Sequence, residues 1–209
     1  MGSHQEYQQL AGILGKLAGC ALGENKKFNK IEVSFYGELH HSADAMFLPV
    51  CSGIFSDADP FQNESEALAY LENNGISFRN RDVDESKKYG ESITLDLLKD
   101  ENCLISVRGT FTENKMMISR LNDFDNLYLS PHGFNIFFEY EDKPGVIARL
   151  SGILCISGFN IADIRAPQVK TGEIPRSLAA IKTDTEVPDE LLTKMADFVN
   201  AITAFKFNC

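Results

Sequence analysis

The first part of the chain places apolar and polar residues at helix and strand spacing. Apolar residues three and four positions apart predict an amphipathic helix over residues 7–22, and strict alternation predicts a strand over residues 31–36. Two helices are predicted next, over residues 43–55 with an interruption at Pro49 and over residues 64–73. Strands are predicted after them, over residues 76–83, 92–98, 104–111 and 116–121. Residues 5–130 are therefore expected to form a mixed α/β domain.

Three glycines, Gly12, Gly15 and Gly19, lie on one side of the first predicted helix. Glycine lowers helix stability, so its repetition at three- and four-residue spacing indicates a surface where another backbone comes close. The spacing differs from the Gly-x-Gly-x-x-Gly turn that binds a dinucleotide, and such a turn would have to follow a strand. We expect a packing surface here and no nucleotide site.

A new pattern begins after the turn at residues 131–133. It predicts a strand over 134–140 and a helix that has Pro144 at its first position and ends before Gly158. An extended segment over 159–166, a strand over 177–183, a helix that opens at Pro188 and a strand over 204–208 follow. The order β-α-β-β-α-β is typical of the ferredoxin-like fold, an antiparallel sheet with two helices on one face. The predicted fold class is thus α+β, with a second domain over residues 131–209.

The turn before the helix at Val146 has the chemistry of a site for a zwitterion. Asp142 supplies a carboxylate for an ammonium group, and the free N–H groups of the helix start attract a carboxylate. Gly145 lacks a Cβ atom and lets a ligand approach the backbone, while Asn160 carries an amide that both donates and accepts. A free amino acid would match these groups, although turn and loop roles alone would also account for Asp142 and Asn160.

The chain is acidic, with a formal net charge of −10 and a pI near 4.9. This charge would repel nucleic-acid phosphates and anionic lipids, so neither nucleic acid nor a membrane is expected as a partner. No apolar run approaches the roughly 20 residues of a membrane span, and no secretory signal pattern begins the chain, which predicts a cytoplasmic protein. The five cysteines are scattered and never form a Cys-x-x-Cys pair, so no metal site is expected.

Two motifs of the second domain resemble a known family. Residues 140–147 (YEDKPGVI) and 157–162 (SGFNIA) are similar to the ACT domain at the end of D-3-phosphoglycerate dehydrogenase, an enzyme of serine synthesis. Upstream, residues 9–18 (QLAGILGKLA) and 33–39 (VSFYGEL) resemble the intervening, allosteric substrate-binding-like domain of the same family. The chain is thus expected to correspond to the C-terminal regulatory part of that enzyme.

The resemblance implies a ligand and an assembly. In the family, L-serine binds between two ACT domains paired edge to edge, which assigns Tyr140, Asp142 and Asn160 to the ligand, with backbone help from Gly145 and Val146. L-serine or another amino acid is the expected ligand, and a homo-oligomer formed by ACT pairing is the expected assembly. The whole enzyme uses NAD, but this sequence has neither the nucleotide-binding turn nor the Arg/Glu/His set of the dehydrogenase. We therefore expect no cofactor and no catalytic activity in this chain alone.

Two other functions stay open from the sequence. The ACT domain could serve only to pair subunits without sensing a ligand, and dimerisation without stabilisation by any amino acid would favour this alternative. Iron–sulfur serine dehydratases also combine these two kinds of domain, but they need a cysteine trio for the cluster and a serine-rich loop. The scattered cysteines and the lack of such a loop argue against a dehydratase.

Overall fold

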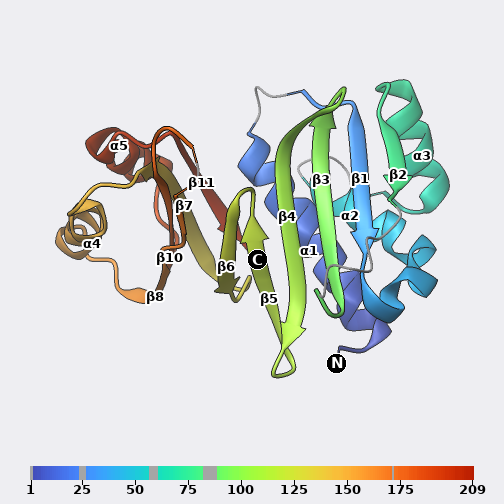
Figure 1. Ribbon diagram of the computed structural model, residues 1–209, viewed down its shortest axis with the longest axis horizontal. Helices are drawn as coiled ribbons and strands as arrows, with labels where there is room; N and C mark the ends of the chain where they lie inside the picture. Colours follow the sequence, from blue (N-terminus) through green and yellow to red (C-terminus); the bar gives the residue numbers. More distant parts are fainter. Residues whose placement is uncertain (1, 24–26, 57–60, 82–88, 171) are drawn as a thin grey trace. The chain divides into compact units, whose positions relative to one another are not determined.

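The computed structural model describes residues 2–23, 27–56, 61–81, 89–170 and 172–209 (Figure 1). The chain divides into two compact units, Met1–Asn122 and Asp123–Cys209. Helices and β-strands are combined in both units, so the predicted α+β class is confirmed. The strand β6 (Phe124–Leu129), which the sequence pattern does not predict, falls between the division after Asn122 and the expected domain boundary after residue 130.

The first unit contains a mixed sheet and its covering helices. Its elements in chain order are α1 (His4–Leu22), β1 (Lys30–Phe35), the 3-10 helices η1 (Gly37–Ser42) and η2 (Asp44–Met46), α2 (Phe47–Ile54), α3 (Glu64–Asn73), β2 (Ser77–Asn80), β3 (Ser92–Lys99), β4 (Asn102–Thr112) and β5 (Lys115–Leu121). The strands lie in the order β2-β1-β3-β4-β5. Strands β1 and β2 run parallel, and the other neighbours run antiparallel.

The elements predicted for the first unit are present, and two of them need correction. Pro49 does not interrupt a helix, because it lies in the first turn of α2, where its missing N–H group costs no intrahelical hydrogen bond. The strand predicted over residues 76–83 is shorter, since β2 ends at Asn80. Residues 82–83 lie outside the described part of the chain.

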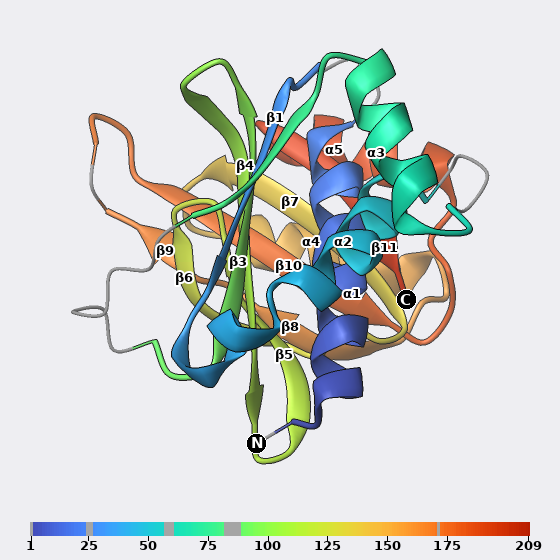
Figure 2. The same ribbon diagram turned by 90° about the vertical axis from the view of Figure 1, so that its right-hand side faces the viewer.

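Alternation along the strands gives the first sheet one apolar face and one polar face. Figure 2 shows α1 and α2 on one side of this sheet. The residues fully buried between α1 and the sheet include Leu10, Leu14, Leu17, Ile31, Val33, Ile93, Leu95 and Val107. Each such side chain contributes about 2 kcal/mol to folding through removal of apolar surface from water. The polar face carries Glu32, Asp96 and Ser106 at the alternate positions.

Helices α1 and α2 meet at a glycine seam formed by Gly12, Gly15 and Gly19 of α1 with Gly53 of α2. A Cβ atom on Gly15 would lie 2.4 Å from the carbonyl oxygen of Val50. A Cβ atom on Gly53 would lie 2.1 Å from the carbonyl oxygen of Gly12. Cβ atoms do not approach oxygen so closely, so both positions require glycine at this helix separation. The close backbone contact predicted from the glycine spacing is confirmed.

The second unit has the predicted β-α-β-β-α-β order, but its first helix begins at Val146 and not at Pro144, because Gly145 takes a left-handed conformation as the N-cap. After β6, its elements are β7 (Phe134–Glu141), α4 (Val146–Ile156), β8 (Ile161–Arg165), the short β9 (Gln168–Val169), β10 (Arg176–Thr183), α5 (Asp189–Val199) and β11 (Thr203–Asn208). The strands lie in the order β11-β7-β10-β8, with β9 also paired to β10, and all neighbours are antiparallel. This is the ferredoxin-like arrangement, and β8 and β11 are its edge strands.

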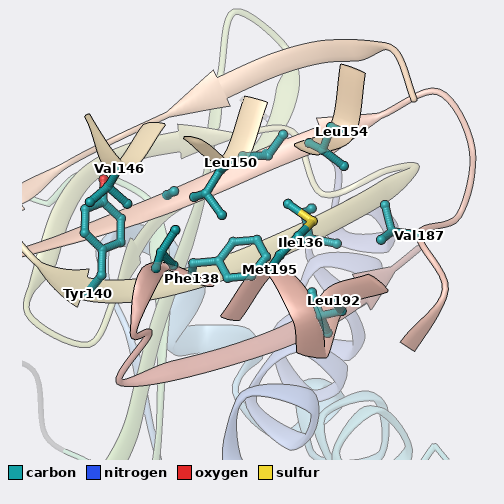
Figure 3. Packing of buried hydrophobic residues seen from close by; sticks show 12 residues of the cluster. Ile136, Phe138, Tyr140, Val146, Leu150, Leu154, Val187, Leu192 and Met195 are labelled. Carbon is teal, nitrogen blue, oxygen red and sulfur yellow. The ribbon is translucent and has the colours of Figure 1, made fainter. Parts of the chain in front are cut away.

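Helices α4 and α5 cover the same face of this sheet (Figure 3). The buried cluster between them and the sheet consists of Ile136, Phe138, Tyr140, Val146, Leu150, Leu154, Ala179, Ile181, Val187, Leu192, Met195 and Val199. Tyr140 is the last residue of β7 in this cluster, and Val146 is the first residue of α4. Their contact holds the end of the strand against the start of the helix, which positions the turn between them.

Candidate functional site

Helix α4 starts at a turn that leaves its first N–H groups without a side-chain cap. Gly145 is the N-cap residue, with φ of 88° and ψ of −5°, a left-handed conformation that favours glycine. Among the described residues no side chain bonds to this helix start, and its first turn has no acidic residue. A Cβ atom on Gly145 would meet no atom within 4 Å, so the space beside it is open. The helix start therefore offers donors and a positive partial charge to an anion.

Asp142 lies in the same turn, with one carboxylate oxygen bonded and the other unbonded. Its Oδ1 accepts a hydrogen bond from Ser177 Oγ at 3.0 Å and a long one from Gln168 Nε2 at 3.5 Å. Its backbone N–H donates to the carbonyl of Pro175 at 2.9 Å, which fixes the turn against the start of β10. Within the described part of the chain, no group bonds to Oδ2. The half-buried carboxylate can therefore accept a hydrogen bond from a cation at Oδ2.

Tyr140 points into the core and not toward the open turn. Its side chain is 3% exposed, and Figure 3 shows the phenol beside Val146 at the start of α4. Burial raises the pKa of the Tyr140 phenol; its hydrogen bond with the Ser177 hydroxyl opposes the rise, and the charge of Asp142 adds to it. Tyr140 therefore supports the turn from below and offers no exposed group to a ligand.

Asn160 lies at the other end of α4. It is exposed and follows Gly158, and its backbone exchanges hydrogen bonds with Asp184, both at 3.2 Å. An 11-residue helix such as α4 is about 16 Å long at the usual rise per residue. No single small ligand can reach both Asp142 and Asn160 of one chain. The structure thus brings Tyr140, Asp142, Gly145 and Val146 together and leaves Asn160 apart from them.

Ser177 and Gln168 belong to this site although the sequence pattern does not indicate them. Ser177 is 2% exposed and lies directly opposite Tyr140 in the pairing of β10 with β7. Gln168 lies in β9 and pairs with Ser177. Both reach Asp142 only through strand pairing. Their place could have been predicted only from the register of β10, which depends on the turn that precedes this strand.

Among the described residues, no group of three or more His, Cys, Asp or Glu side chains is arranged to hold a metal ion. No described helix is both long and apolar enough to span a membrane. The turn at Asp142 is the candidate site because it places a carboxylate beside the uncapped start of α4.

Sequence comparison finds relatives that share most of this chain. The D-3-phosphoglycerate dehydrogenase of Methanocaldococcus jannaschii is 25% identical over 207 residues, which cover 96% of this chain and 37% of that protein. The protein of the same name from Bacillus subtilis is 24% identical over 202 residues, which cover 91% of this chain and 38% of that protein. This chain is similar to D-3-phosphoglycerate dehydrogenases.

The resemblance to D-3-phosphoglycerate dehydrogenase, stated above from short motifs, is thereby confirmed over both units. The chain spans little more than a third of the length of these relatives, 37% for the M. jannaschii protein. No protein-family model matches the chain. A solved prephenate dehydratase from Staphylococcus aureus aligns with 88% of this chain at 14% identity and a TM-score of 0.25, a likeness too weak to support a conclusion.

Proposed function

We propose that this chain is an amino-acid-sensing regulatory region of a D-3-phosphoglycerate dehydrogenase, with L-serine as its ligand. The similarity to enzymes of that name over nearly the whole chain supports the parent enzyme. One structural observation supports the ligand class: Asp142 keeps an unbonded carboxylate oxygen next to the uncapped start of α4. A negative and a positive group side by side match the two charges of a free amino acid.

The ligand would lie across the turn in one orientation. Its α-carboxylate would accept hydrogen bonds from the first N–H groups of α4, and its ammonium group would donate to Oδ2 of Asp142. Gly145 leaves the approach to the backbone open, since no atom lies within 4 Å of its Cβ direction. Uncharged analogues lack one or both of these interactions and would bind weakly.

A second copy of the chain would complete the site. Strand β8 is an edge strand, and two copies related by a two-fold axis would pair their β8 strands antiparallel. The start of one β8 would then lie beside the end of the other. Asn160 directly precedes β8, whereas Gln168, which reaches Asp142, follows its end. Pairing therefore brings Asn160 of one copy toward Asp142 of the other. One small ligand could then contact both, although the length of α4 separates the two residues within one copy.

In the whole enzyme this site would report the level of the pathway's end product. A ligand held between two copies favours the arrangement of the pair that it bridges. The ligand can shift the closure of a catalytic part by no more than the difference between its affinities for the two arrangements. We assign NAD binding and hydride transfer to the part of the relatives that this chain does not cover, and neither of them to this chain. The chain alone would act as a binding module without dehydrogenase activity.

Thermal unfolding against a panel of ligands tests the proposal. L-serine at about 100 times its dissociation constant should stabilise the folded chain by roughly 2.7 kcal/mol, which raises Tm measurably. D-serine and phosphate should have no such effect. Asp142→Asn should lose the response, while Asp197→Asn, an exposed change on α5, should keep it.

The outcomes separate sensing from assembly. A shift with L-serine in the wild type that is lost in Asp142→Asn supports the proposed site. A chain that forms dimers in sedimentation experiments but responds to no amino acid would be a pairing module, and the proposed function would be wrong.

A further inference from the structure

Ser177 lies directly beneath the carboxylate of Asp142. It is 2% exposed, and its hydroxyl donates to Asp142 Oδ1 at 3.0 Å. It comes from β10, opposite Tyr140 on the helix-covered face of the sheet. A buried hydroxyl that donates to a half-exposed carboxylate fixes which oxygen of that carboxylate faces outward.

Strand pairing and core packing hold Ser177 in place. A carboxylate only accepts hydrogen bonds, so the single hydroxyl proton of Ser177 goes to Asp142. Ser177 pairs with Tyr140 across β10 and β7. Tyr140 is packed in the core with Val146, so the strand pair that carries Ser177 is fixed beneath Asp142.

The other donor to Asp142 cannot replace Ser177. Gln168 is exposed, and its Nε2 lies 3.5 Å from Oδ1, at the limit of a hydrogen bond. A long flexible amide at that distance contributes little to the orientation of the carboxylate. Ser177 has the shorter bond and the buried position.

We propose that Ser177 is the positioning residue of the site, which holds Oδ1 of Asp142 so that Oδ2 faces the ammonium group of an amino acid. This inference rests on the proposed amino-acid binding and adds a residue that the resemblance does not assign. Tyr140 supports the strand pair that carries Ser177 and does not contact the ligand. The effect of Ser177 is therefore confined to ligands that carry an ammonium group.

Affinities for two ligands in four proteins test the assignment. L-serine and 3-hydroxypropionate, which is serine without its ammonium group, are titrated by NMR into the wild type, Ser177→Ala, Ser177→Thr and Ser92→Ala. Ser92 is the matched control, because it is a strand serine with 1% exposure whose Oγ has no partner among the described residues. The loss of one charge-assisted hydrogen bond should weaken L-serine binding about tenfold in Ser177→Ala and leave 3-hydroxypropionate unchanged.

Ser177→Thr keeps the hydroxyl and should retain most of the affinity for L-serine, and Ser92→Ala should bind both ligands as the wild type does. An equal loss for both ligands in Ser177→Ala would show a general packing defect and overturn the positioning role. Unchanged L-serine affinity in Ser177→Ala would also overturn it while leaving the proposed function intact. If the wild type binds no amino acid, the proposed function fails, and the positioning role fails with it.

Discussion

Two aspartates, Asp96 in the first unit and Asp142 in the second, show how differently one residue type is used in this chain. Asp96 is 6% exposed, and both of its oxygens are bonded: Oδ1 accepts from Ser106 Oγ at 2.5 Å and Oδ2 from Arg81 Nη2 at 2.7 Å. Arg81 also bonds to Glu32 on the neighbouring strand. Asp142 is partly exposed, and within the described residues its donors lie at Oδ1 alone.

The difference separates a structural carboxylate from a binding one. The charge of Asp96 is already neutralised and its acceptors are filled, so no ligand can gain by approaching it. Asp142 is held at one oxygen, and its other oxygen has no donor among the described residues. An acceptor that is oriented by the protein and still unfilled is what a cationic ligand requires.

The largest expected effect comes from replacing each aspartate by asparagine. In Asp96→Asn the amide must turn its NH2 group toward Ser106 or Arg81, both of which donate, so unfolding free energy should fall by about 2 kcal/mol. In Asp142→Asn the amide oxygen can keep the bond from Ser177 and the NH2 group can face water, so the loss should stay below about 0.5 kcal/mol. Urea unfolding measures both, and equal losses would remove the distinction.

L-serine affinity should fall in Asp142→Asn and not in Asp96→Asn, which is the reverse of their effects on stability. A variant of Asn160 extends this test. Asn160→Ala should weaken L-serine binding about tenfold, as expected for one hydrogen bond to a charged group, and should leave Tm without ligand unchanged. Asn73→Ala, an exposed change in the first unit, is the matched control. Full L-serine affinity in Asn160→Ala, measured by calorimetry, would exclude Asn160 from the site.

The smallest expected effect is a pH dependence from the charges around Asp96. Although burial opposes the shift, hydrogen bonds from Lys30 and Arg81 lower the pKa of Glu32. A lowered carboxyl pKa adds stability above the ordinary value of about 4.3, and this stability is lost as pH falls through the lowered pKa. Glu32→Gln should therefore lose less unfolding free energy than the wild type as the pH falls below about 4.3. Lys30→Met, which removes one of the two donors, should lie between the variant and the wild type.

Most of the fold could be predicted because its signals are local. The strands of the second unit are runs rich in aromatic and aliphatic residues, and turns such as the one at Gly145 mark their ends. Strand β6 could not be predicted, because Asp125 and Asn126 break its alternation and Asn126 and Tyr128 have positive φ. The first turn of α1 was open to prediction, since Ser3 and Glu6 form a capping box that starts this helix before residue 7.

The candidate site divides in the same way. Asp142, Gly145 and Val146 are neighbours in sequence, so their chemistry could be predicted without knowledge of the fold. Ser177 could not be predicted, because it meets Asp142 only through the register of β10 with β7. The inward direction of Tyr140 follows from the alternation that it shares with Ile136 and Phe138, and this signal was available in the sequence.

The glycine seam has a mechanical consequence for the first unit. A side chain between two helices can change rotamer to accommodate a small shift, whereas α1 and α2 meet through their main chains at Gly12 and Gly53. The two helices therefore have little freedom to twist or shift against each other and behave as one rigid unit. Any rearrangement of the first unit must therefore move α1 and α2 together, and any enlargement at one seam glycine must displace the whole of the opposite helix.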